Sequence, residues 1–173
     1  MTHLNPPVNS KDHIKGKNSA PIVLVEYGDY QCPHCGHAYP IIKNIQRSLG
    51  DNLKFVFRNF PLSEIHPDAF NAAVAAEAAA LQDKYWEMHD IIFENQQELG
   101  VEDLFFYAKK IGLDMERFKN DVQKNMLSTN VENDFESGIK SGVNGTPSFY
   151  INGVKYNGNW EEDVFIRHLK SLL

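Results

Sequence analysis

The chain has 173 residues, of which 42% are hydrophobic and 23% charged, and its formal net charge is −6. This length and composition predict one soluble globular domain, with a core large enough to need no stabilising disulfides. The negative charge and the scattered lysines argue against nucleic acid as a partner, because phosphate binding needs a concentrated basic surface. No apolar tract in the sequence is long enough to cross a bilayer.

The first 20 residues are rich in Asn, Lys, Pro and Ser and show no apolar period. They predict an extended N-terminal arm, residues 1–20, ahead of the first structural element. They also lack a charged segment followed by an apolar run, which is the pattern of a secretory signal. The sequence as written therefore indicates a cytoplasmic protein, or a periplasmic or extracytoplasmic one from which a signal was removed. The folded domain is expected to span residues 21–173.

A buried strand is predicted for Ile22–Tyr27, a β-branched apolar run between Pro21 and Gly28. Apolar residues then recur at helical spacing up to Gly50, where a helix should end. The alternating segment Leu53–Phe60 predicts a second strand. A right-handed crossover through the helix would make these two strands parallel.

A large helical insertion is predicted from about residue 67 to residue 140, beginning with an Ala-rich run that is typical of closely packed helices. The chain then returns to strand at Ser148–Ile151 and Val154–Tyr156, and Asn152-Gly153 between them is a strong hairpin signal. A last helix is expected at Glu161–Leu173. Four of its apolar side chains should face the core: Val164, Phe165, Leu169 and Leu172. The fold class is therefore α/β, with the order β-α-β, helices, β-β-α.

The two cysteines of the chain lie in the segment Cys32-Pro33-His34-Cys35, where the helix begins. Two thiols at this spacing can form a disulfide, with Cys32 exposed as the nucleophile and Cys35 facing inward. Unpaired N–H groups at a helix start favour negative charge, so the pKa of Cys32 should be lowered. Pro33 suits this position because it has no N–H, and His34 can donate a hydrogen bond or place positive charge beside the sulfur.

Glu26 and Pro147 are two further candidate site residues. A carboxylate in an apolar strand is costly unless it is paired or functional. Alternation places Glu26 on the face of Ile22 and Leu24; beneath the cysteine helix it would have a raised pKa and could exchange a proton with Cys35. The alternative is a carboxylate at the strand end that reaches solvent. Thr146-Pro147 precedes the hairpin, and because most X-Pro bonds are trans, the sequence alone does not predict a cis bond.

Together these residues resemble the DsbA-like branch of the thioredoxin superfamily, from about Pro21 to the C-terminus. Cys32-Pro33-His34-Cys35 matches the active-site motif residue for residue, Glu26 stands where the family keeps a buried acid, and Thr146-Pro147 matches the cis-proline loop that binds substrate backbone. The resemblance implies a thioredoxin-like fold with a large helical insertion. It also implies a thiol-disulfide oxidoreductase, above all an oxidase, that acts on protein thiols or disulfides without a cofactor or metal.

The resemblance further implies an unidentified redox partner and allows that partner to be membrane-bound. Thr146 stands where the best-known periplasmic members have Val, so the redox potential and the choice of partner do not carry over. A cytosolic copy would meet a reducing glutathione pool and could act as a reductase or isomerase instead.

Three other functions are open from the residues alone. Cys32, His34, Cys35 and His37 are potential zinc ligands, although structural zinc usually takes four ligands from two separated pairs. A peptide-binding or chaperone-like module would keep the fold and hold peptides beside Thr146-Pro147 without redox turnover. A glutathione-using transferase or isomerase of related fold would be expected to lack the intact cysteine pair.

Overall fold

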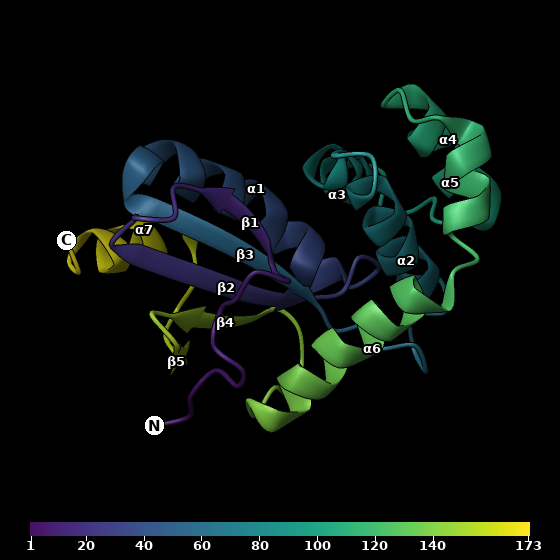
Figure 1. The fold of residues 1–173 in the computed structure, drawn as a ribbon. Coiled ribbons are helices and arrows are strands. Elements are labelled where there is room, and N and C mark those ends of the chain that lie inside the picture. Colours follow the sequence, from purple (N-terminus) through teal and green to yellow (C-terminus); the bar gives the residue numbers. More distant parts are fainter.

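The computed structural model describes all residues, 1–173, as a five-stranded mixed sheet with helices on both faces (Figure 1). The strands lie in the order β1-β3-β2-β4-β5. Their bounds are β1 His13–Gly16, β2 Ile22–Gly28, β3 Leu53–Asn59, β4 Ser148–Ile151 and β5 Val154–Tyr156. β2 and β3 are parallel, as predicted, whereas every other pair is antiparallel.

The central strand β2 separates two apolar cores, because successive side chains of a strand point to opposite faces. Ile22 and Leu24 belong to the larger core, and Val25 and Tyr27 belong to the smaller one. Helices α1 and α7 pack on the larger core, and α6 lies across the other face (Figure 1). Their bounds are α1 Pro33–Leu49, α6 Asn125–Lys140 and α7 Glu162–Lys170, and a short 3₁₀ turn, η1 Gly50–Asn52, follows α1.

The helical insertion lies between β3 and β4 and consists of α2 to α6 (Figure 1). Its other helices are α2 Ala69–Ala80, α3 Tyr85–Glu94, α4 Val101–Lys110 and α5 Met115–Asp121. Most of the Ala-rich helix α2 is buried, because small side chains let neighbouring helices approach closely. None of the helices combines the length and the apolar character that are needed to span a membrane.

The last part of the chain agrees with the sequence-based prediction at the hairpin and differs from it in α7. Asn152 and Gly153 join β4 to β5 with φ values of 48° and 82°, as a tight hairpin turn requires. In α7, Phe165 and Leu169, four residues apart, are fully buried. The prediction that Val164 and Leu172 also face the core is wrong: they are 38% and 47% exposed. Val164 lies off the buried stripe of the helix, and Leu172 lies beyond its last residue.

The N-terminal strap, residues 2–16, crosses the sheet from β5 to β3 (Figure 1). The backbone N–H of Leu4 donates to the carbonyl of Gly153 at 2.8 Å, and that of Lys155 donates to the carbonyl of Thr2 at 2.9 Å. At its other end the strap forms β1 along the edge of β3. The expectation that the first structural element follows residue 20 is therefore wrong, because the free edge of β3 binds a polar segment that has no apolar pattern.

Candidate active site

The two cysteines lie at the start of α1, after the C-terminal end of β2 (Figure 1). Cys32 is the N-cap residue, with an extended backbone (φ −70°, ψ 123°), and Pro33 is the first helical residue. The N–H groups of a first helical turn have no partners within the helix, and Pro33 removes one of them. The remaining N–H groups favour a negative charge on the sulfur of Cys32.

Both cysteines are free thiols and both are buried. Cys35 is fully buried, and its Sγ accepts a hydrogen bond from the N–H of Asp29 at 3.4 Å. The Sγ of Cys32 lies 3.6 Å from the carbonyl oxygen of Thr146. The expectation that Cys32 is exposed is wrong, since only 4% of its surface is accessible. The loop at Thr146 lies against the sulfur.

Cys32 is the acidic member of the pair. A hydrogen bond from the Cys35 thiol is the largest cause that lowers the pKa of Cys32 to about 5, and the backbone N–H groups of Cys35 and His34 add to it against the opposing effect of burial. Burial raises the pKa of the Cys35 thiol well above its ordinary value. At neutral pH the site therefore holds one thiolate and one thiol, which is the combination that thiol-disulfide exchange uses.

His34 contributes to this site through its backbone. Its ring is exposed to solvent and forms no hydrogen bond with either sulfur, whereas its backbone N–H helps to lower the pKa of Cys32. The expected hydrogen bond from the His34 side chain is therefore not formed. The effect of the ring's charge on the sulfur stays a prediction.

Glu26 is 3% exposed and lies between Phe57 of β3 and Phe149 of β4 in the sheet. The alternative in which this carboxylate reaches solvent is thus wrong. Burial is the main cause that raises the pKa of Glu26 to about 8, and the negative charge on Cys32 adds to it. A cavity of about 10 Å³ borders Glu26 and is close to the smallest space that holds one water molecule.

The small cavity beside Glu26 leads toward charged groups. Lys43 and Asp90 also line it, and they form an ion pair with 2.7 Å between Nζ and Oδ2. Their side chains are 30% and 26% exposed, so the pair lies at the boundary between the cavity and solvent.

Thr146 and Pro147 lie directly before β4, and the peptide bond between them is cis. β4 pairs with β2, which precedes the cysteines, so the two loops leave the same region of the sheet. The carbonyl of Thr146 faces the sulfur of Cys32, as described above. The Oγ1 of Thr146 is buried, and the Thr146 side chain lies close enough to Cys32 to help lower the pKa of its thiol.

Asp29 is a site residue that no sequence expectation included. One of its carboxylate oxygens accepts hydrogen bonds from the N–H groups of Gln31 and Cys32, at 2.7 and 3.1 Å. The other accepts from the N–H of Leu62 at 2.9 Å and from the ring of His66 at 2.8 Å. One buried carboxylate therefore joins the cysteine turn to the loop after β3. An Asp at a strand-to-helix turn is a local signal for such a role, because Asp often caps nearby backbone N–H groups.

Gln96, in the loop after α3, is a second residue that sequence reasoning missed. Its Nε2 donates hydrogen bonds to the carbonyls of Cys32 at 2.6 Å and Tyr30 at 3.0 Å. The same side chain passes so close to Gly36 that a Cβ there would lie 2.1 Å from Oε1. The insertion therefore holds the cysteine turn directly, and a larger residue after Cys35 would have to displace the end of the Gln96 side chain.

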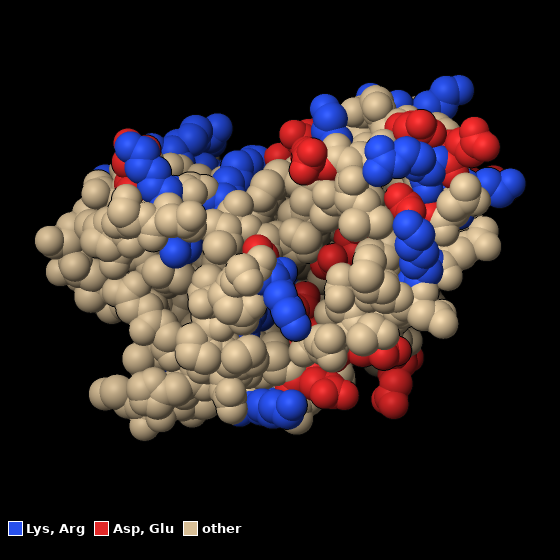
Figure 2. Space-filling view, in the orientation of Figure 1, with Lys and Arg blue, Asp and Glu red and all other residues tan.

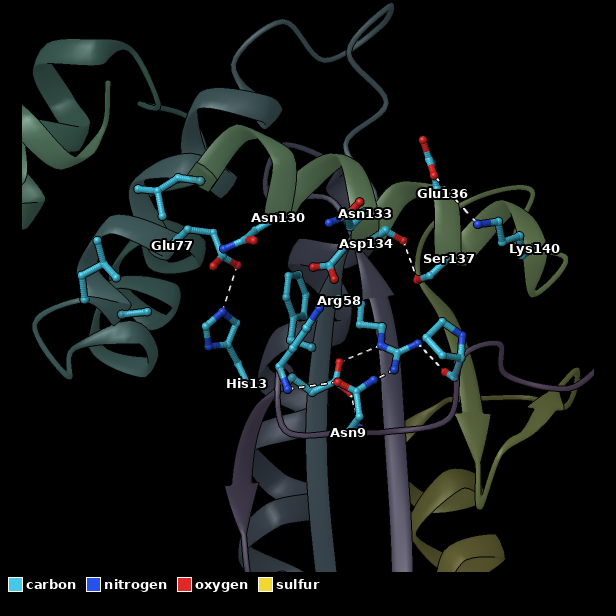
Figure 3. A pocket seen from close by; sticks show the side chains of 17 residues that line it. Asn9, His13, Arg58, Glu77, Asn130, Asn133, Asp134, Glu136, Ser137 and Lys140 are labelled. Carbon is cyan, nitrogen blue, oxygen red and sulfur yellow. Dashed lines mark hydrogen bonds and ion pairs between the residues drawn. The ribbon is translucent and has the colours of Figure 1, made fainter. Parts of the chain in front are cut away.

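A large cavity lies away from the cysteines, between the N-terminal strap, α2 and α6 (Figure 3). It has a volume of about 830 Å³, and neither cysteine lines it. Figure 3 shows His13 and Glu77 pointing toward each other and Arg58 held by neighbours in the strap. Most of its charged groups are thus paired with one another. Nowhere in the chain do three or more His, Cys, Asp or Glu side chains form a group that could hold a metal ion.

Comparison with known sequences agrees with this geometry. A family model described as Thioredoxin matches residues 8–171. The Na⁺/H⁺ antiporter NhaA 1 of Mycolicibacterium vanbaalenii is 41% identical over 170 residues, which cover 97% of this chain and 28% of that protein. The protein of the same name from Salinispora arenicola is 39% identical over 150 residues, which cover 87% of this chain and 23% of that protein. The chain therefore spans only a minor part of these longer relatives.

Solved structures share the architecture along almost the whole chain. BdbD from Bacillus subtilis is 25% identical with a TM-score of 0.85, covering 99% of this chain and 97% of that one. A thioredoxin-like oxidoreductase from Silicibacter pomeroyi is 24% identical with a TM-score of 0.83, covering 94% and 92%. Wolbachia pipientis alpha-DsbA1 is 22% identical with a TM-score of 0.83, covering 98% and 94%. The last two likenesses concern the fold alone.

Proposed function

The chain belongs to the thioredoxin family and has the DsbA-like fold, and we propose that it exchanges disulfides with protein substrates through Cys32 and Cys35. The observation that carries the proposal is the contrast between the two sulfurs. The pKa of Cys32 is lowered to about 5, while that of its buried neighbour Cys35 is raised. A structural cysteine pair would not need this contrast, whereas an exchange reaction needs one good leaving group and one protected thiol.

In the oxidising direction, a substrate thiolate attacks the Sγ of Cys32 in the Cys32–Cys35 disulfide. The bond between the two cysteines breaks, and Cys35 leaves with the electron pair and takes up a proton. A second substrate thiolate then attacks the substrate sulfur of the mixed disulfide, and Cys32 leaves as a thiolate. The substrate loses two electrons and the protein gains them. A redox partner must then reoxidise the protein.

We assign Glu26 as the group that donates a proton to the sulfur of Cys35. Its pKa of about 8 makes it a carboxylic acid at neutral pH, so it can donate a proton to the leaving sulfur of Cys35 and recover it from solvent. The small cavity between Glu26 and the Lys43–Asp90 pair supports this step, since it has room for about one water on the way to the surface.

Thr146 and Pro147 are the residues that we assign to substrate binding. The loop lies beside the sulfur of Cys32, with the carbonyl oxygen of Thr146 3.6 Å from it, and the Thr146 side chain helps to lower the pKa of that thiol. An extended substrate could therefore pair its backbone with this loop while its cysteine reaches Cys32. The proposed site thus consists of Cys32, Cys35, the intervening Pro33 and His34, Glu26, and this loop.

We propose net oxidation of substrates as the physiological direction, because an acidic Cys32 stabilises the reduced protein and makes its disulfide more oxidising. The thiol-disulfide exchange activity named for alpha-DsbA2 of Wolbachia pipientis is consistent with this reaction class. The catalytic unit that we propose is one domain over residues 21–173, completed by the N-terminal strap and carrying its insertion at about residues 67–140.

Trapping of the mixed disulfide tests the proposed reaction. Cys35→Ser should capture substrate proteins as complexes that migrate separately on a non-reducing gel and disappear on reduction. Cys32→Ser should capture none, and it should neither oxidise a dithiol peptide nor reduce insulin. If wild type and Cys32→Ser behave alike in both assays, the protein is a peptide-binding or chaperone-like module instead.

Measuring the reduction potential against glutathione then gives the direction of electron flow, because the reduction potential of a strong oxidant lies well above that of thioredoxin.

A further inference from the structure

A groove lies beside the cysteine turn and is lined by the loop after β3, the start of α2 and one side of α6. Its volume is about 740 Å³, within the range of ligand-binding clefts. We call it the β3–α2 groove. Its lining residues are Pro61, Leu62, Ser63, Glu64, Ile65, Phe70, Glu132, Phe135 and Glu136.

The apolar part of this groove is held in place before any ligand binds. Ile65 is 69% exposed, yet its N–H donates to the carbonyl of Leu62 at 3.0 Å, and Leu62 is in turn fixed to Asp29. Phe135 stacks on Phe60 with 4.4 Å between the ring centroids. An exposed isoleucine on an ordered turn, beside a fixed aromatic ring, offers apolar contact at little entropic cost.

The charged part of the groove has one sign only. Glu64, Glu132 and Glu136 line it, and no Lys, Arg or His does. Figure 2 shows acidic side chains at the lower edge of the molecule, over α6 and the loop that precedes α2. Glu136 has a partner in Lys140 at 3.9 Å, whereas Glu64 and Glu132 have no ion pair within the chain. The unpaired carboxylates complement a cationic ligand.

The groove is joined to the backbone of the cysteine turn through Asp29. The same carboxylate that accepts from the N–H of Leu62 also accepts from the N–H of Cys32. An extended polypeptide advances about 3.3 to 3.6 Å per residue, so a substrate whose cysteine lies at Cys32 reaches this loop within a few residues.

We propose that the β3–α2 groove binds the segment of the substrate polypeptide next to its reactive cysteine, and that it selects segments with apolar and basic side chains. The inference rests on the proposed function, since the groove adds substrate selection to the same site. Apolar side chains would contact Ile65 and Phe135, while Lys or Arg side chains would lie against Glu64 and Glu132. The overall charge of −6 favours the approach of the same ligands.

Two matched dithiol peptides test the selection. They carry the same Leu and Phe residues beside the cysteines, and their flanks contain Lys in one and Glu in the other. The disulfide form of the wild-type protein should oxidise the Lys peptide with the higher kcat/KM, and added salt should reduce the difference. Dithiothreitol, which has no flanks, reports the chemistry of the cysteines alone.

Substitutions in the groove test which of its residues cause the preference for the Lys peptide. Glu132→Lys and Glu64→Lys should each lower kcat/KM for the Lys peptide by about fivefold. Ile65→Ser should lower it for both peptides by a similar factor. All three should oxidise dithiothreitol like the wild type. Matched controls are Glu116→Lys and Phe106→Ser, an exposed Glu on α5 and a Phe on α4 that is 62% exposed, and neither should change any rate.

The inference is overturned if both peptides react equally, or if the groove substitutions act no differently from the controls. It is also overturned if sedimentation shows a dimer that Ile65→Ser dissociates, because the groove would then be an interface between two copies. If the wild type fails to oxidise dithiothreitol, the proposed function fails instead. Binding of cysteine-free versions of the two peptides, followed by fluorescence anisotropy, still decides the groove: a Lys preference that Glu132→Lys removes supports it, and equal binding refutes it.

Discussion

Glu26 and Cys32 are two acidic groups in a buried region, and each makes a negative charge on the other more costly. Their pKa values of about 8 for Glu26 and about 5 for Cys32 mean that the sulfur ionises first. At neutral pH the reduced protein therefore carries its charge on Cys32 and its proton on Glu26. The site therefore holds a nucleophilic thiolate on Cys32 together with a protonated carboxyl group on Glu26 that can act as an acid.

Removing the thiol of Cys35 should raise the pKa of Cys32. In Cys35→Ala we expect a rise of about one to two pH units, because the hydrogen bond from Cys35 is the largest cause of the low value. His34→Ser keeps the backbone N–H and should therefore change the pKa much less. Ultraviolet absorbance of the thiolate, followed against pH, measures both variants. A larger shift in His34→Ser than in Cys35→Ala would show that the imidazole ring, and not Cys35, controls the pKa of the sulfur.

Replacing Glu26 should change how stability depends on pH. A carboxyl group with an ordinary pKa of 4.5 that rises to about 8 on folding stabilises the folded state below 4.5, and this contribution is lost as pH rises through 8. Glu26→Gln does not titrate, so relative to the wild type it should gain stability between pH 4.5 and 8, by at most about 5 kcal/mol.

Urea unfolding of the reduced proteins at several pH values measures this gain. The exposed Glu132→Gln is the matched control and should follow the wild type at every pH. A constant difference between Glu26→Gln and wild type from pH 5 to 8 would mean that Glu26 is already ionised in the folded protein.

At the level of elements, the turn between β2 and α1 depends on partners that lie far away in the sequence. Asp29 receives two of its hydrogen bonds from Leu62 and His66, after β3, and Gln96 reaches the same turn from beyond α3. These contacts explain how a short turn can hold two sulfurs in different environments. The helical insertion thus supports the site as well as enlarging the fold.

Loss of the Asp29 carboxylate should loosen this turn. Asp29→Ala leaves several buried donors without their acceptor and should lower the free energy of unfolding by about 3 kcal/mol. It should also slow the oxidation of dithiol peptides, because the cysteine turn loses its link to the loop after β3. The control is Asp114→Ala, which removes a carboxylate that caps one N–H of α5 and should cost about 1 kcal/mol. Urea midpoints compare the two, and equal losses would contradict the role of Asp29.

The sequence predicts those elements whose signal is local. Ile22–Tyr27 is an apolar run and forms the buried strand, and Asn152-Gly153 forms the hairpin turn that its residue types require. Burial of Glu26 agrees with one of the two interpretations that its place in the strand allowed. β1 could not be predicted, because its short polar segment is ordered by the free edge of β3 and not by a pattern of its own. Asp29 was missed for a related reason, since its importance comes from residues that folding brings to it.

On the scale of the whole molecule, the N-terminal strap connects both edges of the sheet. It bonds to the β4–β5 hairpin at one end and forms β1 beside β3 at the other. In between, Asp12 makes a bidentate ion pair with Arg58, at 2.7 and 2.9 Å, and both side chains are almost fully buried. Arg58 also donates to the carbonyl of Pro6 at 2.9 Å, so one cation holds the middle of the strap.

Breaking this ion pair should destabilise the whole fold. Asp12→Asn leaves the buried charge of Arg58 without its partner and should lower the free energy of unfolding by about 3 to 5 kcal/mol. Adding Arg58→Met should restore part of the loss, because the unpaired charge is then removed. The control is Asp51→Asn, which breaks the exposed pair with Lys17 and should cost less than about 1 kcal/mol. Urea unfolding measures all three, and similar values for Asp12→Asn and Asp51→Asn would contradict the prediction.

The path of the strap imposes an order of events on the growing polypeptide. Thr2 and Leu4 leave the ribosome long before Lys155 and Gly153, the residues to which they bond. Until that hairpin has been translated, the early segment can form backbone pairs only at the edge of β3, and the apolar side chain of Leu4 lacks the cover that Tyr150 supplies. The N-terminal strap therefore completes its pairing late. A nascent chain arrested shortly before Gly153 would expose the apolar face of the sheet near Leu4 to chaperones.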